Sequence, residues 1–199
     1  MDNSTVDQKP AIQPASRAEW RAWLAENHAT STGVWLITWK KQAARPTVAY
    51  EAAVEEALCF GWIDGVVNRV DDERTKEWFA PRRAKSTWAR TNKDRVARLE
   101  AAGLMTEAGR AAIAIAQANG SWTSLDAIDA LVVPDDLAAA LVAKPGAREQ
   151  FEASSASVRR MALAWVYGAK RPETRATRVE QVAAIAGRGE PIANLWRRD

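Results

Sequence analysis

Three cations lie within four consecutive positions of the chain, at Arg82, Arg83 and Lys85. They stand between the end of an expected β-hairpin and the start of an expected helix, where Ser86 supplies a hydroxyl that can cap the helix. Guanidinium forks bind carboxylate and phosphate groups with two hydrogen bonds, and a helix N-terminus also favours anions. The pattern predicts an anion-binding site. The alternative is that the arginines only neutralise Asp64 or the glutamates of an earlier helix.

Asp64 is the candidate for acid–base chemistry. Alternation along an expected strand at 62–70 puts Trp62, Asp64 and Val66 on one face. A carboxylate among apolar neighbours must be hydrogen-bonded, paired or functional, because burying it alone is costly. Gly65 in mid-strand indicates a bulge or the close approach of another group. Two interpretations stay open: a catalytic or ligand-orienting carboxylate, and a carboxylate that pairs with an arginine for structure alone.

Tryptophan is unusually frequent, with ten residues in a chain of 199. Each indole can bury roughly 150–250 Å², so we expect most of them in the core. Trp62, Trp78 and Trp88 lie close to the cations in the sequence. They can form an aromatic wall that stacks on a ligand or on a guanidinium.

Other reactive side chains are few. Cys59 falls in the last turn of an expected helix, where the helix dipole disfavours a thiolate. His28, the single histidine, is expected to cap the end of the first helix. One cysteine and one histidine do not make a zinc site, and no phosphate loop, dinucleotide fingerprint or Ser–His–Asp set is present. We expect no metal and no cofactor.

Hydrophobic periodicity predicts an α+β fold. An N-terminal α-β-α-β-β unit with a small sheet of about three strands is followed by a helical C-terminal half. Ser16 and Glu19 form a capping-box signature before the first helix. The later elements are expected at 33–40, 47–60, 62–70 and 74–80, with an acidic turn at 71–73.

The helical half is divided by glycine and proline. Pro172 is expected in the first turn of the last helix, and Gly187 at its C′ position. We predict a flexible tail over 1–15, an α+β domain over 16–122 and a helical region over 123–199, packed on that domain or forming a subdomain.

Composition indicates a globular protein, with 47% hydrophobic and 27% charged residues. No apolar run is long enough for a membrane-spanning helix, so we expect no membrane insertion. The first ten residues carry no apolar segment, which predicts no secretory signal, and a single cysteine cannot form an internal disulfide. Cytoplasm is the expected compartment.

Charge is distributed in blocks. Residues 81–99 carry seven basic and one acidic side chain, and residues 158–199 carry nine and four. Such blocks attract phosphate, carboxylate or nucleic acid. The alternative for the C-terminal block is a set of solvated helix faces.

Several motifs resemble the YdeI/OmpD-associated family, also described as bacteriocin-protection. The resemblance covers roughly Ser16 to Ala186, in order along the chain. The matching segments are Tyr50–Gly65 (YEAAVEEALCFGWIDG), Phe79–Trp88 (FAPRRAKSTW), Asn92–Leu99, Gly103–Gly109, Ser157–Arg160 and Ala169–Glu180. Ala84 stands where family members often have proline, and Ala156 departs similarly.

This resemblance implies a part in tolerance of antimicrobial peptides and an association with an outer-membrane porin. It implies no particular catalytic mechanism. Some members are described as periplasmic, and a chain expected to lack a signal departs from them, which argues against direct porin contact.

Three functional hypotheses follow from these features. The first is a cytoplasmic ligand-binding and stress-protection protein that holds a small anionic or aromatic molecule in a tryptophan-lined basic pocket. The second is an enzyme that uses Asp64 as general acid or base in the same pocket. The third is nucleic-acid binding through the basic segments. The predicted ligand-binding residues are Trp62, Asp64, Arg82, Arg83, Lys85, Ser86, Trp88 and Asn92.

Overall fold

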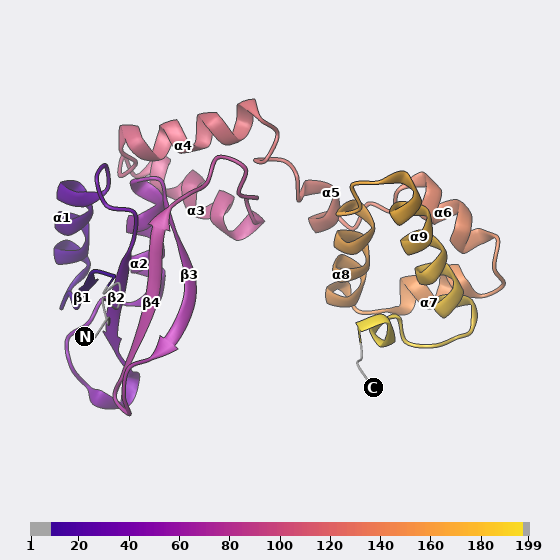
Figure 1. Cartoon of the computed structure of the whole chain (residues 1–199), viewed down its shortest axis with the longest axis horizontal. Helices are drawn as coiled ribbons and strands as arrows, with labels where there is room; N and C mark the ends of the chain where they lie inside the picture. The colour runs from indigo at the N-terminus through magenta and orange to yellow at the C-terminus, as the bar shows by residue number, and fades with distance from the viewer. Residues whose placement is uncertain (1–8, 197–199) are drawn as a thin grey trace, which may run out of the picture. The chain divides into compact units, whose positions relative to one another are not determined.

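The computed structural model describes residues 9–196, which divide into two compact units (Figure 1). The first unit ends at Thr123 and the second begins at Ser124. The α+β class is confirmed: a sheet and helices form the first unit, and helices form the second. No helix in the described part of the chain is long and apolar enough to span a bilayer.

The sheet of the N-terminal unit has four strands in the order β1-β2-β4-β3. The additional strand is β1, which is two residues long and pairs in parallel with β2. It lies within the segment that was predicted as a flexible tail. The other pairs are antiparallel, with Trp35 of β2 opposite Trp78 of β4. The strands are β1 Ala11–Ile12, β2 Val34–Trp39, β3 Trp62–Arg69 and β4 Arg74–Pro81.

The hairpin between β3 and β4 forms around Asp71, as the acidic turn predicts. Its Oδ1 atom accepts hydrogen bonds from the backbone N–H groups of Glu73 and Arg74, at 2.9 and 2.7 Å. Short acidic side chains favour turns for this reason. The predicted bulge at Gly65 is also present, because the register with β4 shifts between Asp64 and Val67.

Four α-helices complete the N-terminal unit: α1 Arg17–Asn27, α2 Tyr50–Cys59, α3 Arg90–Ala101 and α4 Glu107–Ala118. A short 3-10 helix, η1 Lys41–Ala43, follows β2. In Figure 1, α2 lies behind the strands, and α3 and α4 lie at one end of the sheet. Ser16 caps α1 by accepting from the N–H of Glu19 at 3.2 Å. The Glu19 carboxylate accepts from the N–H of Ala15 instead of reaching Ser16, so the capping box is only half formed.

Seven of the ten tryptophans are buried in a hydrophobic core or pack against one, as the sequence predicts. Trp20, Trp62 and Trp88 are at most 2% exposed, and the other seven are only partly buried. Two of the buried indoles have hydrogen-bond acceptors: Trp20 donates to the carbonyl of Ala53 at 3.0 Å, and Trp62 to that of His28 at 3.3 Å. A buried indole N–H needs such a partner.

The C-terminal unit consists of α5 Asp126–Asp129, α6 Asp135–Val142, α7 Ala147–Ala153, α8 Ala156–Tyr167, α9 Pro172–Gly187 and the 3-10 helix η2 Ile192–Trp196. Its own apolar core includes Leu137, Phe151 and Leu163. Pro172 opens α9 as predicted. The C′ glycine is Gly189, with φ of 69°, and not Gly187, which still belongs to the helix. The left-handed backbone at Gly189 is what a C′ glycine supplies.

Candidate functional site

The loop from β4 to α3 folds back so that Arg82 lies on Trp88. The backbone N–H of Arg82 continues the sheet pairing by donating to Gly61 at 2.9 Å. Its guanidinium carbon lies 3.8 Å from the centroid of the Trp88 ring, and its Nη2 donates to the carbonyl of Thr87 at 2.7 Å. The stacked geometry fixes the direction of the guanidinium.

Two donor atoms of Arg82 have no hydrogen-bond partner among the described residues. Nε and Nη1 are both buried. Burial lowers the pKa of Arg82 to about 10, and the negative charge of Asp64 opposes this shift. The guanidinium therefore stays charged at neutral pH. A buried charged donor without an acceptor is costly.

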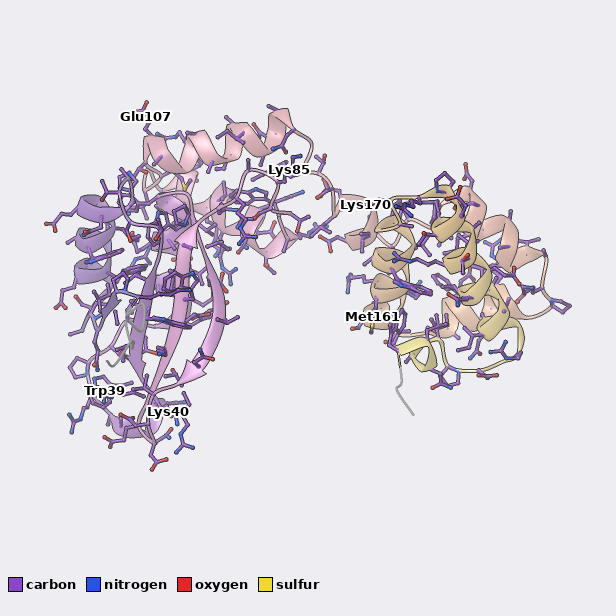
Figure 2. The ribbon with its side chains drawn as sticks, in the orientation of Figure 1. Trp39, Lys40, Lys85, Glu107, Met161 and Lys170 are labelled. Carbon is purple, nitrogen blue, oxygen red and sulfur yellow. The ribbon has the colours of Figure 1, made fainter. Side chains whose placement is uncertain are left out.

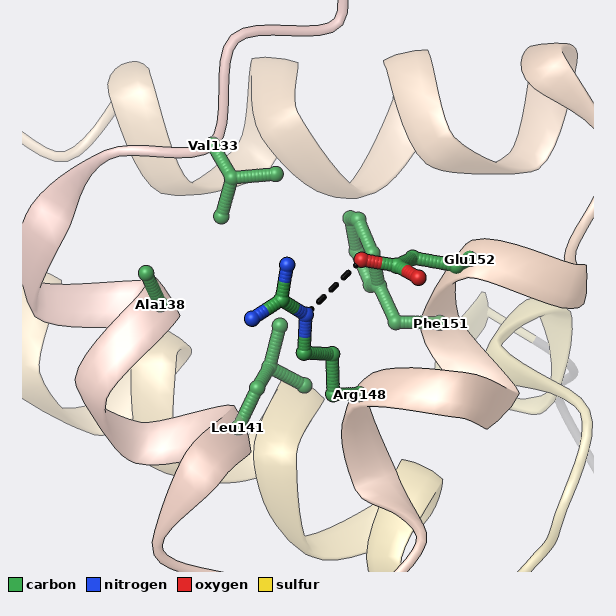
Figure 3. A pocket seen from close by; sticks show the side chains of 6 residues that line it. All are labelled: Val133, Ala138, Leu141, Arg148, Phe151 and Glu152. Atoms are coloured by element: carbon green, nitrogen blue, oxygen red, sulfur yellow. Dashed lines mark hydrogen bonds and ion pairs between the residues drawn. The ribbon is translucent and has the colours of Figure 1, made fainter.

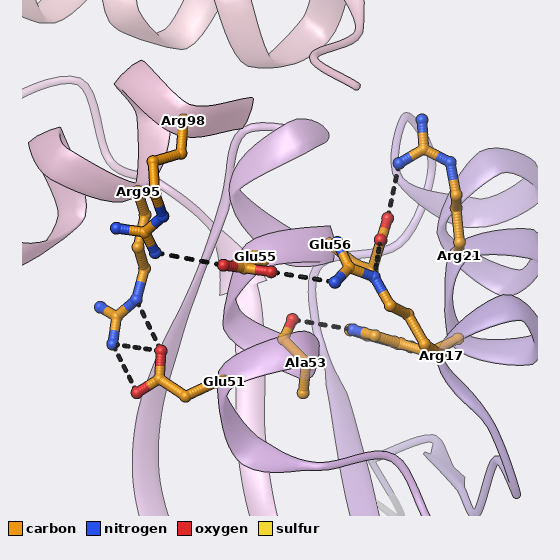
Figure 4. A network of polar contacts seen from close by, with 9 residues as sticks. Arg17, Arg21, Glu51, Ala53, Glu55, Glu56, Arg95 and Arg98 are labelled. Carbon is orange, nitrogen blue, oxygen red and sulfur yellow. Dashed lines mark hydrogen bonds and ion pairs between the residues drawn. The ribbon is translucent and has the colours of Figure 1, made fainter. Parts of the chain in front are cut away.

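The most buried carboxylate of α2 is paired with arginines of α1. Glu56 is only 2% exposed. Its two oxygens accept from Nε of Arg17 at 2.5 Å and from Nη1 of Arg21 at 2.6 Å (Figure 4). A buried carboxylate requires such compensation.

The outer glutamates of α2 are paired in the same way. Arg95 of α3 forms a bidentate pair with Glu51, through Nε at 3.0 Å and Nη2 at 2.9 Å. Glu55 lies between Arg17, at 3.0 Å, and Arg98, at 3.2 Å (Figure 4). The glutamates that could have neutralised Arg82 and Arg83 thus have other partners, so the alternative interpretation fails for them.

A cavity of about 390 Å³ opens beside Arg82. Arg82, Arg83 and Trp88 line one side of it, His28 at the end of α1 contributes to the rim, and α4 supplies an apolar wall. That wall is formed by Ala108, Ala111, Ala112, Ile115 and Ala116. A second hollow of about 450 Å³ shares His28, Ala108 and Ala111 with it, so the concave surface continues along α4.

Helix α4 reaches this position because Gly109 lets it approach the end of α2. A Cβ atom at Gly109 would lie 2.3 Å from the carbonyl oxygen of Cys59. Thr106, the N-cap of α4, donates its hydroxyl to the same oxygen at 2.6 Å. The position of the apolar wall depends on this close contact between α4 and α2. The alanines of α4 could not be recognised as site residues from the sequence.

His28 is the C-cap of α1, as predicted. Its Nδ1 donates to the carbonyl of Leu24 at 2.9 Å. Sequence reasoning missed its place on the cavity rim, because nothing local links residue 28 to residue 82.

Of the eight predicted ligand-binding residues, the structure brings Arg82, Arg83 and Trp88 together around the cavity. Lys85 is exposed in the same loop. The backbone N–H of Ser86 donates to the carbonyl of Arg83 at 2.8 Å, which closes a turn. Ser86 does not cap a helix, since α3 begins at Arg90 with Ala89 as its N-cap.

The other three predicted residues lie elsewhere. Trp62 is a core residue, with its ring 5.8 Å from that of Trp23, and does not line the cavity. Asn92 accepts from Nη1 of Arg95 at 2.7 Å and helps to orient that arginine toward α2. Asp64 faces the buried side of the sheet, opposite Phe79 of β4.

Asp64 belongs to an acidic cluster that includes two residues the sequence analysis did not single out. Its Oδ2 accepts from the hydroxyl of Tyr50 at 3.1 Å. Burial and the charge of Asp64 raise the pKa of Glu77 to about 7. Burial, with the same carboxylate, raises the pKa of Tyr50 to about 12. Strand alternation, which puts Glu77 on the face of Phe79, is the signal that would have found it.

Two cations of the C-terminal block, Arg175 and Arg178, have partners within that unit. Arg175 pairs with Asp136 at 2.6 Å, and Nη1 of Arg178 donates to the carbonyl of Trp165 at 2.6 Å. A small cavity of about 120 Å³ lies between α6 and α7, where Arg148 pairs with Glu152 at 2.9 Å (Figure 3). Arg175 and Arg178 thus fit the alternative of paired helix faces.

The remaining reactive groups are Cys59 and the side chains that could bind a metal. Cys59 is fully buried, and burial raises the pKa of its thiol. Within residues 9–196, no three His, Cys, Asp or Glu side chains are grouped to hold a metal ion.

Fold and site together define an α+β unit with an arginine-bearing cavity, joined in sequence to a separate helical unit. Residues 12–112, just over half of the chain, match a family described as a domain of unknown function, DUF8412. Residues 130–189 match the family described as bacteriocin-protection, YdeI or OmpD-associated. The chain therefore belongs to the DUF8412 family and carries a YdeI/OmpD-associated domain. No curated protein and no solved structure matches it.

The predicted family is thus confirmed, over a shorter segment than the sequence motifs indicated. The YdeI/OmpD-associated match lies in the helical unit. The motifs Tyr50–Gly65 and Phe79–Trp88 fall within the DUF8412 match instead.

Proposed function

We propose that this YdeI-like protein is a cytoplasmic ligand-binding and stress-protection protein. Its ligand is a small anion with a flat or apolar part, held in the cavity between Arg82 and α4. The observation that carries the proposal is the pair of buried donors on Arg82, which are charged, oriented by Trp88 and without an acceptor among the described residues.

The chemistry of the cavity defines the ligand class. Nε and Nη1 of Arg82 are covered by protein atoms in the structure, so a carboxylate or phosphate oxygen would reach them after a movement of the side chain. Hydrogen bonds between charged groups are roughly twice as strong as neutral ones. The alanines and Ile115 of α4 would contact the apolar part of the ligand. A volume of about 390 Å³ is within the range of small-molecule sites.

The test is calorimetric titration with benzoate, phenyl phosphate and inorganic phosphate as probes. We expect Arg82→Met to weaken binding of an aryl anion roughly 30-fold or more, because one partner of a buried charged pair is removed. The control is Arg110→Met, an exposed arginine of α4 that pairs with Glu100 at 3.0 Å. Equal affinity of wild type and Arg82→Met would reject the proposal.

An enzymatic function is the second candidate, and the acidic cluster favours it. Glu77, with a pKa of about 7, is suited to proton transfer near neutral pH, beside Asp64 and Tyr50. The cavity beside Arg82 is not lined by these residues. Asp64→Asn separates the two proposals: it would abolish turnover in an enzyme and leave anion binding nearly unchanged.

A further inference from the structure

A second concentration of aromatic and basic side chains lies on the face of the sheet opposite the core. Trp35 and Trp39 of β2 and Trp78 of β4 are all partly exposed. Their strand neighbours Val34 and Leu36 point the other way and are at most 1% exposed. None of the three tryptophans belongs to the hydrophobic core of the unit or packs against it. We call these three residues and their cations the tryptophan face.

Each indole of the tryptophan face carries at least one cation. Lys76 lies 4.7 Å from the ring centroid of Trp35, and Lys9 lies 4.7 Å from that of Trp78. Trp39 has two neighbours, Arg45 at 4.5 Å and Arg74 at 5.4 Å. A cation over an indole ring is attracted to the ring by a cation–π interaction, so these contacts stabilise the folded protein without any ligand.

Most of this positive charge is not neutralised within the described residues. Arg74 pairs with Asp71 at 2.6 Å. Lys9, Arg45 and Lys76 form no ion pair with a carboxylate in residues 9–196; their described contacts are with the rings. The face therefore presents indole rings and unneutralised cations side by side.

The backbone is shaped to hold one of these rings flat against the sheet. A Cβ atom at Gly33 would lie 2.2 Å from Cζ2 of Trp78, and one at Gly65 would lie 3.3 Å from the Trp78 carbonyl oxygen. Trp35 packs edge-on against Trp78, with centroids 5.2 Å apart. Trp39 is four residues from Trp35 along β2, which is roughly 13 Å in an extended strand.

We propose that the tryptophan face binds single-stranded nucleic acid. Bases would stack on the indoles, and Lys9, Arg45 and Lys76 would leave the rings to pair with phosphates. Each nucleotide of a single strand carries both a base that can stack on an indole and a phosphate that can pair with a cation. Stacking of bases on aromatic rings tolerates any sequence. An acidic peptide would use the cations but would give the three indoles no stacking partner.

None of the three tryptophans of this face, and none of their cations, lines the cavity beside Arg82. Figure 2 shows Trp39 and Lys40 at one end of the N-terminal unit and Lys85 and Glu107 at the other. The tryptophan face also differs from the basic segments of the sequence analysis, in which Arg95 and Arg98 are bound to α2 glutamates. The two sites can be tested independently.

The experiment is fluorescence anisotropy with labelled 20-nucleotide oligo-dT and oligo-rU. We expect binding that weakens roughly 20-fold between 50 and 200 mM salt, the dependence for about three phosphate contacts on a single strand. Trp39→Ala should weaken binding roughly 5- to 150-fold, the range for loss of one stacked base, and Trp39→Phe should keep most of the affinity. A preference for either oligonucleotide supports the proposal and assigns RNA or DNA.

Two controls separate this proposal from a structural role and from the anion site. Trp165→Ala removes an indole that also carries an arginine, Arg178 at 5.3 Å, in the other unit, and should bind normally. Arg82→Met should also bind normally. Circular dichroism and urea midpoints establish that each variant is folded, and Arg45→Met replaces Trp39→Ala if the latter is not.

Three outcomes would overturn the proposal. The first is no binding of either oligonucleotide at 50 mM salt. The second is equal affinity of wild type, Trp39→Ala and Arg45→Met. The third is self-association that Trp39→Ala abolishes while oligonucleotides do not bind, which would assign the face to a second copy of the chain.

Discussion

The arginines around α2 are paired with carboxylates, whereas Arg82, which stacks on Trp88 in the same unit, is paired with none in the described part of the chain. Arg17, Arg21 and Arg95 each contact a glutamate at 2.5 to 3.0 Å. Arg82 is buried against an indole, with two donors that have no described acceptor. The first set contributes to the fold by holding three helices together. A buried charge with unpaired donors, such as Arg82, is expected to cost stability.

The largest effect is expected from breaking the paired set. Glu56→Gln removes the charge that Arg17 and Arg21 share, inside a site where the carboxylate is 2% exposed. We expect the free energy of unfolding to fall by about 3 kcal/mol, the lower end for broken buried pairs because both arginines are partly exposed. Urea denaturation measures this change. Glu100→Gln, which breaks an exposed pair with Arg110, should cost about 0.5 kcal/mol or less.

Replacing Arg82 is expected to raise the free energy of unfolding instead of lowering it. Arg82→Met removes a buried charge with unpaired donors but keeps an apolar stem and a thioether against Trp88. We expect the free energy of unfolding of the unliganded protein to rise by about 1 kcal/mol. A large loss of stability would contradict the comparison, because it would make Arg82 a structural residue like Arg17.

The smallest effect concerns the acidic cluster and depends on pH. The pKa of Glu77 is about 7 in the folded protein, against an ordinary value of 4.5. Between these values the folded state binds more protons than the unfolded state, so stability falls as pH rises from 4.5 to 7. For a half-buried carboxyl we expect a loss of about 1 kcal/mol.

Glu77→Gln checks this prediction, because it should remove that loss and make the variant more stable than wild type at pH 8. Thermal melts from pH 4.5 to 8 provide the measurement. The same pH dependence in both proteins would assign it to another group.

Local elements were predicted well because their signals lie within a few residues. Ser16 begins α1, Asp71 forms the hairpin turn, and Gly65 marks a bulge. Element ends were less certain, as Gly189 in place of Gly187 shows, since both glycines fit the pattern and only backbone geometry selects one. The strand β1 was missed because two residues leave no periodicity to detect.

The candidate site was predicted in part. Arg82, Arg83 and Trp88 are neighbours in the chain and remain together in the fold. Trp62 was assigned to the site, but it does not line the cavity. Alternation along β3 predicts which face of the sheet Trp62 lies on, but it does not predict which element packs on that face. The alanines of α4 could not be identified, because small apolar side chains become a cavity wall only when another element lies opposite them.

The sequence alone determined the helices, the hairpin, the supply of cations and the faces on which Asp64 and Trp62 lie. Tertiary structure decided which arginine has a carboxylate and which does not. Glu55 and Arg17 are 38 residues apart, and Glu51 and Arg95 are 44. The charge of a side chain can be read from its residue type. Whether that charge is neutralised depends on its distance from an opposite charge in the folded protein, and sequence separation does not give that distance.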